Sequence, residues 1–184
     1  MIRIVILAIM IACTVGCSSV RPPSTEELHA IEQPSPANAA WLESLGPLAV
    51  AWFSEQEKEL LPHGRPLNAD EVKIARQMGV QHPDRVRVII MREFPLPDDP
   101  ILFKELKTLG LGSPLAGGRS LGYAVLIKPK YENQPWLLAH ELVHVGQRER
   151  FGTEAFIRRY LLELRVFGYA RAPLEIEANR GARD

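Results

Sequence analysis

The sequence predicts an α+β fold that is mostly helical, with a short β-sheet packed on one central helix. Segments 85–91 and 120–128 are rich in β-branched residues and are expected to form strands. Several other segments space their apolar residues as helices do, between capping residues, prolines and glycines. One of these, 135–151, is apolar on most of its faces, so we expect it at the centre of the domain.

The chain is expected to divide into a leader, a tether and one domain. Residues 1–16 combine Arg3, an apolar run and small residues before Cys17, which resembles a bacterial lipoprotein signal. The resemblance implies that Cys17 becomes the lipidated first residue, anchored in the cell envelope at the periplasmic side of the outer membrane. A secretory signal cut near Gly16 is the alternative. Residues 17–40 contain four prolines and several serines, so we expect a flexible tether.

Residues 41–184 are expected to form a single domain. The chain has 184 residues, of which 46% are hydrophobic, as in ordinary globular proteins. Cys17 would be the one cysteine of the mature chain, so the domain would depend on its core and not on disulfides. Lysine plus arginine balances aspartate plus glutamate at 22 each, which gives no indication of a nucleic-acid-binding surface.

Helices are predicted before, between and after the two strands. Pro47 suits a first helical position after a break at Gly46, so we expect a helix over 48–61. Asn68 and Glu71 have the spacing of a capping box for the next helix. The remaining helices are predicted over 69–78, 101–109, 135–151, 154–167 and 174–180.

The helix over 135–151 contains a His-Glu-x-x-His motif. His140 and His144 are four residues apart, so both imidazoles project from one helix face and can bind the same metal ion. Glu141 can activate a water for attack in such a motif. The alternative is a buried helix whose two histidines are only hydrogen-bonded. The other histidines are expected at the surface: His29, His63 and His82.

A catalytic zinc site needs three protein ligands and an open position for water. No histidine follows His144 in the chain. Gln147 and Arg150 stand where the metzincin pattern requires glycine and histidine, so that class of metallopeptidase is excluded. The third ligand is therefore expected among the acidic residues downstream of the motif.

Five glutamates follow the motif. Glu149 is on or next to the metal helix itself and cannot easily reach across the ion. Glu154 and Glu163 are expected on the solvated face of the following helix. Glu175 and Glu177, in the last predicted helix, are the best candidates.

His140-Glu141-Leu-Val-His144 followed by Glu175-x-x-Ala178-Asn179 is similar to the gluzincin metallopeptidases, over residues 121–180. The resemblance implies that Glu175 binds zinc and that Asn179, where the family usually has aspartate, accepts a hydrogen bond from a ligand histidine. Helical geometry agrees, because Glu175 and Asn179 share a face and Glu177 points about 200° away. Glu177 remains the alternative.

The resemblance also implies an oxyanion donor and a substrate-binding strand. The family often uses tyrosine, histidine or arginine as the donor. Here Tyr123, Tyr160, Tyr169 and Arg171 are candidates, and Tyr169 is taken as the catalytic residue. The strand before the metal helix is usually an exposed edge that pairs with an extended substrate, which here would be 121–128. An ordinary buried strand is the alternative.

Together these expectations describe a zinc-dependent peptidase anchored at the cell envelope by its lipid. Zn²⁺ would be held by His140, His144 and Glu175, and Glu141 would take a proton from the zinc-bound water and pass it to the leaving amine. The substrate would be a peptide or protein. The alternative is a non-catalytic zinc-binding lipoprotein with a structural or interaction role, because so small a domain leaves little for a second cleft wall. The sequence leaves open whether an unidentified protein partner supplies that wall.

Overall fold

The computed structural model describes residues 21–183, and these form the predicted α+β fold. The predicted leader, 1–16, and the lipidation site, Cys17, lie outside the described residues. Within residues 21–183, no helix has the length and apolar character needed to cross a membrane.

Four short strands form one mixed sheet in the order β1-β2-β4-β3. β1 (Arg65–Pro66) is antiparallel to β2 (Arg87–Ile90), which is parallel to β4 (Ala124–Ile127), and β3 (Gly118–Leu121) is antiparallel to β4. Alternate residues of β4 enter two different hydrophobic clusters, since successive side chains of a strand point to opposite faces. The sheet therefore lies between two apolar layers.

The predicted single strand over 120–128 is wrong, because this segment forms the hairpin of β3 and β4. Gly122 begins the two-residue loop with a φ of +64°, which residues with a side chain rarely adopt. A Cβ there would also collide with the carboxylate of Glu57, which accepts a hydrogen bond of 2.8 Å from the Tyr123 N–H. The edge strands of the sheet are therefore β1 and β3, and most of the segment expected as an edge is the buried interior strand β4.

Helices surround the sheet, and short 3-10 turns connect several elements. The 3-10 turns are Leu61–His63, Pro83–Arg85, Pro129–Tyr131 and Tyr169–Arg171. The helices are α1 (Thr25–Glu32), α2 (Pro36–Leu60), α3 (Ala69–Gln77), α4 (Pro100–Thr108), α5 (Pro135–Phe151), α6 (Thr153–Phe167) and α7 (Pro173–Gly181).

The predicted capping box is confirmed at α3. The Asn68 side chain accepts hydrogen bonds from the N–H groups of Asp70 and Glu71, and the Glu71 carboxylate accepts one from the Asn68 N–H. The Asp99 side chain likewise accepts hydrogen bonds from N–H groups in the first turn of α4. Local sequence thus determines where these two helices begin.

The predicted break at Gly46 and Pro47 is wrong, because α2 runs without interruption through both residues. A proline within a helix removes one backbone hydrogen bond and is unfavourable by itself. The helix is maintained by tertiary packing, since one face of α2 is buried against α6 and the sheet. Gly46 lies on that face, where a Cβ would approach the Arg158 guanidinium at 2.8 Å.

Ordered structure also begins earlier than predicted. The described part of the expected tether contains all of α1 and the start of α2. Ser24 and Glu27 form a capping box for α1. Arg171 attaches this helix to the domain, because its guanidinium donates hydrogen bonds to the Glu27 carboxylate (2.7 Å) and to the Arg21 carbonyl (3.1 Å).

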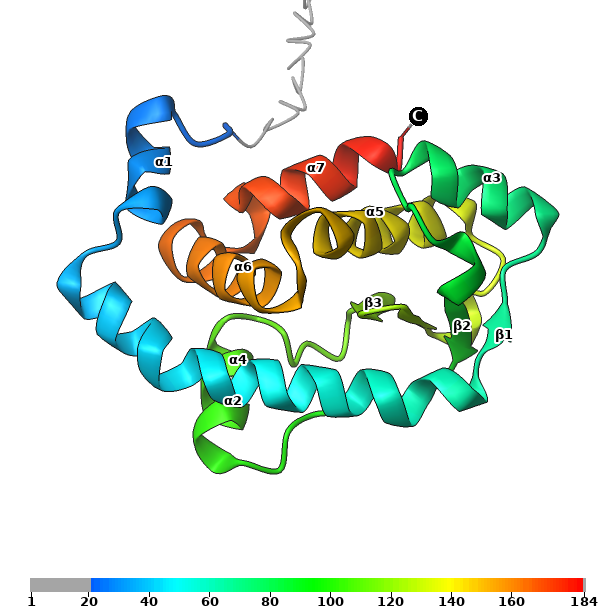
Figure 1. Cartoon of the computed structure of the whole chain (residues 1–184), viewed down its shortest axis with the longest axis horizontal. Helices are drawn as coiled ribbons and strands as arrows, with labels where there is room; N and C mark the ends of the chain where they lie inside the picture. The colour runs from blue at the N-terminus through cyan, green and yellow to red at the C-terminus, as the bar shows by residue number, and fades with distance from the viewer. Residues whose placement is uncertain (1–20, 184) are drawn as a thin grey trace, which may run out of the picture.

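Helices lie on both sides of the sheet, and α6 contacts helices of both sides. In Figure 1, α2 and α4 lie on one side of β3, and α5 and α7 lie on the other, with α6 beside them. One hydrophobic cluster joins α2, α4, α6 and one face of the sheet, and the second joins α3, α5 and the other face.

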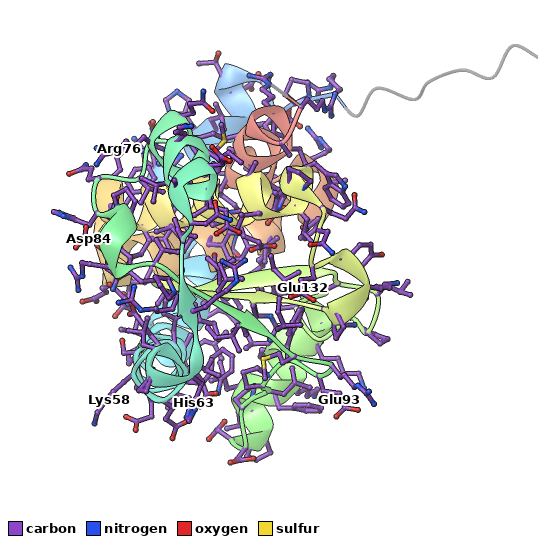
Figure 2. The ribbon with its side chains drawn as sticks, turned by 90° about the vertical axis from the view of Figure 1, so that its right-hand side faces the viewer. Lys58, His63, Arg76, Asp84, Glu93 and Glu132 are labelled. Carbon is purple, nitrogen blue, oxygen red and sulfur yellow. The ribbon has the colours of Figure 1, made fainter. Side chains whose placement is uncertain are left out.

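In Figure 2 several polar side chains extend outward from one face of the molecule: Lys58, His63, Arg76, Asp84, Glu93 and Glu132. The surface positions expected for three histidines are confirmed at His29, His63 and His82.

Candidate metal centre and its cavity

Helices α5 and α7 bring together the three predicted metal ligands. His140 and His144 are one turn apart on α5, and Glu175 lies in the first turn of α7. His140 Nε2 is 3.5 Å from Glu175 Oε2, and His144 Nε2 is 3.3 Å from Glu175 Oε1. One potential ligand atom from each residue lies within 4.8 Å of the other two, and all three residues are buried. This group could hold a metal ion.

The Glu175 carboxylate has one satisfied oxygen and one unsatisfied oxygen. Oε1 accepts a hydrogen bond of 2.6 Å from the Tyr160 hydroxyl. Among residues 21–183, Oε2 is the one buried side-chain polar atom without a hydrogen-bond partner. A buried acceptor left unpaired is unfavourable by about 1–3 kcal/mol, so such atoms usually have a role. Beside two imidazole nitrogens, Oε2 fits a ligand to a cation.

The protonation states of the triad match a site built for positive charge. Burial alone would lower the pKa of His144, but the Glu175 carboxylate, 3.3 Å from its Nε2, and the charge of Glu141 outweigh burial and raise that pKa from 6.5 to about 9. Burial alone would raise the pKa of Glu175, but the imidazoles of His140 and His144, 3.5 and 3.3 Å from its carboxylate oxygens, hold that pKa well below 4.5. In the metal-free site, both ring nitrogens of His144 are therefore protonated at neutral pH.

Glu141 lies beside the triad and packs against the sheet edge. It is only 4% exposed and lines the same cavity as the three candidate ligands. A Cβ on Gly118 of β3 would be 2.5 Å from Glu141 Oε1, so the carboxylate rests directly on the backbone of that strand. Burial raises the pKa of Glu141, which makes it a better proton acceptor near neutral pH than an exposed carboxylate.

The residue that supports His144 is Gln147, which the sequence analysis did not identify. His144 Nδ1 lies 2.8 Å from Gln147 Oε1, and Gln147 Nε2 donates a hydrogen bond of 3.0 Å to the Leu174 carbonyl. Because that carbonyl can only accept, Oε1 must face His144 and Nδ1 must carry the proton. Nε2 of the ring is then directed to the triad. The available signal was a polar residue three positions after His144, on the same helix face.

The prediction that Asn179 supports a ligand histidine is wrong, because Asn179 is exposed. Glu177, the alternative ligand, is also outside the triad. Its carboxylate accepts two hydrogen bonds of 2.9 Å from Arg150 at the surface. The choice of Glu175 over Glu177 therefore agrees with the structure.

Glu163 was expected on a solvated helix face and is instead fully buried. Its carboxylate accepts hydrogen bonds of 2.8 Å from the Leu174 N–H and from Arg159 Nε. The first of these satisfies an N–H in the first turn of α7, where helical backbone has no partner of its own. Glu163 thus helps position the helix that carries Glu175.

Two of the four candidate oxyanion donors lie at the cavity. Tyr160 lines it but donates its hydroxyl to Glu175, and Tyr169 lines it with 49% of its surface exposed. Burial and the charge of Glu175 raise the pKa of Tyr169, which keeps its hydroxyl protonated as a donor. Tyr123 donates to Glu149, and Arg171 is paired with Glu27.

The cavity has a volume of about 500 Å³ and extends from the triad to residues of α2, α4 and α6. The wall opposite the candidate metal ligands consists of residues from α2, α4 and α6. The chain itself therefore supplies the second wall that so small a domain was expected to lack.

No protein-family model, curated protein or solved structure matches this chain.

Proposed function

We propose that this protein is a zinc-dependent peptidase that is held at the bacterial cell envelope by a lipid on Cys17. The observation that carries the catalytic part is the buried His140–His144–Glu175 group, with an unpartnered carboxylate oxygen and Glu141 in the same cavity. The anchor rests on the sequence pattern before Cys17.

Zinc is the metal that this donor set and its neighbour favour. Two imidazoles and one carboxylate with an open position suit catalytic zinc, and also iron in some oxygenases. Glu141 distinguishes the two, because a buried carboxylate beside the metal ligands serves hydrolysis as a proton carrier. When bound, zinc would supply Lewis-acid chemistry that polarises a carbonyl and lowers the pKa of water to about 7.

The residues of this chain would divide the remaining work. Glu141 accepts the proton of the attacking water on its carboxylate and delivers it to the leaving amine. Tyr169 donates its hydroxyl to the oxygen of the carbonyl under attack, where negative charge develops. Tyr160 and Gln147 hold Glu175 and His144 in place. The edge strand β3 borders the cavity and suits an extended peptide.

The experiment that tests this proposal compares Glu141→Gln with Glu177→Gln in the purified full-length protein. Metal analysis should find one zinc per chain in the wild type and both variants. Peptide-library cleavage, followed by mass spectrometry, should fall by about 10²- to 10⁴-fold in Glu141→Gln, because the proton carrier is lost. Glu177→Gln should cleave the peptides like the wild type. A chelator should stop cleavage by the wild type and by Glu177→Gln.

Three results would contradict the proposal. Iron in place of zinc would indicate redox chemistry. Cleavage that survives in Glu141→Gln would show that another group carries the proton. Stoichiometric zinc without cleavage of any peptide would favour the non-catalytic zinc-binding module.

A further inference from the structure

The cavity has two chemically different ends. The candidate metal ligands and Glu141 come from α5 and α7. The opposite wall comes from α2, α4 and α6 and is apolar. It includes Ala49, Trp52, Phe53, Leu106, Ile157 and Leu161.

Arg119 is the one lysine or arginine among the described residues that line this cavity. Its guanidinium donates hydrogen bonds to the carbonyls of Pro95 (2.8 Å) and Leu111, and it lies 5.3 Å from the centre of the Phe94 ring. It is thus occupied in joining two loops to β3. The apolar wall consequently offers no cation to a charged ligand group.

We propose that the apolar end is a specificity pocket for a bulky apolar side chain of a peptide, next to the bond that is cleaved. This inference rests on the proposed peptidase function. A cavity of about 500 Å³ is within the range of pockets that enclose a specific ligand, and it exceeds what a small side chain would fill. Each methylene that enters such a pocket changes the specificity constant by about 10- to 200-fold.

The neighbouring strand edge indicates a peptide and not a free acyl chain. The Lys128 N–H donates a hydrogen bond of 2.9 Å to the Gly117 carbonyl, which makes these residues a hydrogen-bonded pair of the β3–β4 ladder. Because such pairs alternate in an antiparallel ladder, Gly118 and Ser120 direct their backbone groups away from β4. Both residues line the cavity, where these groups can pair with a peptide backbone.

Ala49 is the position at which the pocket can be narrowed without touching the metal site. It is buried on α2 and lines the cavity, so a larger side chain there occupies the apolar end. Ala51 is two residues away on the same helix and is exposed, which makes it the matched control. Leu111 also lines the cavity and is only partly buried, so shortening it enlarges the pocket at little cost to the core.

The test measures the specificity constants of zinc-loaded, full-length variants on peptides that differ only at one residue beside the cleaved bond. The wild type should prefer phenylalanine or leucine to alanine by at least 100-fold. Ala49→Phe should reduce this ratio at least 10-fold, and Ala51→Phe should leave it unchanged. Leu111→Ala should increase the specificity constant for the tryptophan peptide relative to that for the phenylalanine peptide. If Ala49→Phe loses zinc or fails to fold, the result for Leu111→Ala tests the pocket by itself.

A binding measurement separates failure of this inference from failure of the proposed function. Calorimetry with zinc-loaded Glu141→Gln should show at least 10-fold tighter binding of the phenylalanine peptide than of the alanine peptide, whether or not cleavage occurs. Two results would contradict the specificity pocket but not the peptidase function. One is cleavage with no side-chain preference, and the other is a preference that neither Ala49→Phe nor Leu111→Ala changes. Tight binding of decanoate, with no discrimination between the peptides, would overturn it in favour of an acyl ligand.

Discussion

The side chain of Gln147 connects the two helices that carry the candidate metal ligands. Its carbonyl oxygen accepts from His144 Nδ1 and its amide donates to the Leu174 carbonyl, next to Glu175. The amide is 1% exposed, so neither bond competes with much solvent. One residue thus sets the tautomer of a ligand on α5 and the position of the first turn of α7.

Replacing Gln147 should weaken metal binding while the fold is retained. We expect Gln147→Met, which keeps the approximate volume but removes both bonds, to reduce zinc affinity by about 10- to 100-fold. Competition with a chromogenic chelator measures the change. Asn179→Ala is the control and should bind zinc like the wild type, because Asn179 is exposed. Equal affinity in wild type and Gln147→Met would contradict the role of Gln147.

Gly118 allows Glu141 to rest on the backbone of β3. A Cβ at Gly118 would lie 2.5 Å from Glu141 Oε1, so Gly118→Ala should displace the carboxylate. A displacement of about 1 Å can reduce kcat by about 10²-fold. Zinc content should be unchanged, since the ligands are not touched. In the control Gly112→Ala, the Cβ would be at an ordinary distance of 3.6 Å from Lys107 Cγ, and activity should persist. If both variants retain full kcat, the contact does not position Glu141.

At the scale of elements, the Glu27 carboxylate is one of the groups that join α1 to the domain. Glu27 accepts hydrogen bonds from Arg171, from Arg21 and from the Ser24 N–H. The hydrogen bond from Arg171, followed by that from Ser24, lowers the pKa of Glu27 from 4.5 to about 2. A lowered pKa stabilises the attached state above pH 4.5, and this contribution disappears as the pH falls towards 2.

Glu27→Gln should therefore loosen α1 at neutral pH. Hydrogen exchange followed by mass spectrometry should be faster over residues 25–32 than in the wild type and unchanged over α5. Glu26→Gln, in the same helical turn and exposed, is the control and should exchange like the wild type. Unchanged protection in Glu27→Gln would show that apolar contacts alone hold α1.

Elements also differ in what determines them. Asn68 and Asp99 begin α3 and α4 through their own side chains, so the sequence predicted both helices closely. The hairpin and the uninterrupted α2 depend on partners distant in sequence. Glu57 accepts from the hairpin loop, and α6 covers the face of α2 that contains Gly46. The helix and strand propensities of the local residues cannot predict such contacts.

For the whole molecule, stability and metal binding should depend on pH in opposite ways. Without metal, the raised pKa of His144 contributes stability below pH 6.5 that is lost as the pH rises through about 9. The lowered pKa of Glu175 contributes stability to the metal-free fold above pH 4.5. Together they favour the metal-free fold most between pH 4.5 and 6.5. Zinc must displace the proton on His144 Nε2. The affinity of the site for zinc should therefore rise by about tenfold per pH unit between pH 6 and 8.

Thermal unfolding measured with and without zinc at pH 6 and pH 8 tests this dependence. The metal-free protein should melt at a lower temperature at pH 8 than at pH 6. The increase produced by the same free zinc concentration should be larger at pH 8, because stabilisation grows with the ratio of zinc to its dissociation constant. An equal zinc-induced increase at both pH values would show that zinc displaces no proton from the site.

The sequence by itself narrowed the third ligand to Glu175 and Glu177. It determined the two histidines on one helix face, Glu141 between them, and most of the helices. These follow from the 3.6-residue repeat and from caps within one or two turns, which are local properties. Tertiary structure alone decided that Glu175 and not Glu177 joins the histidines, that Gln147 supports His144 and that Glu163 is buried. It also decided that β3 is an edge strand and that α2, α4 and α6 enclose the cavity. Each of these depends on which segments, distant in the chain, become neighbours when their apolar faces are buried together.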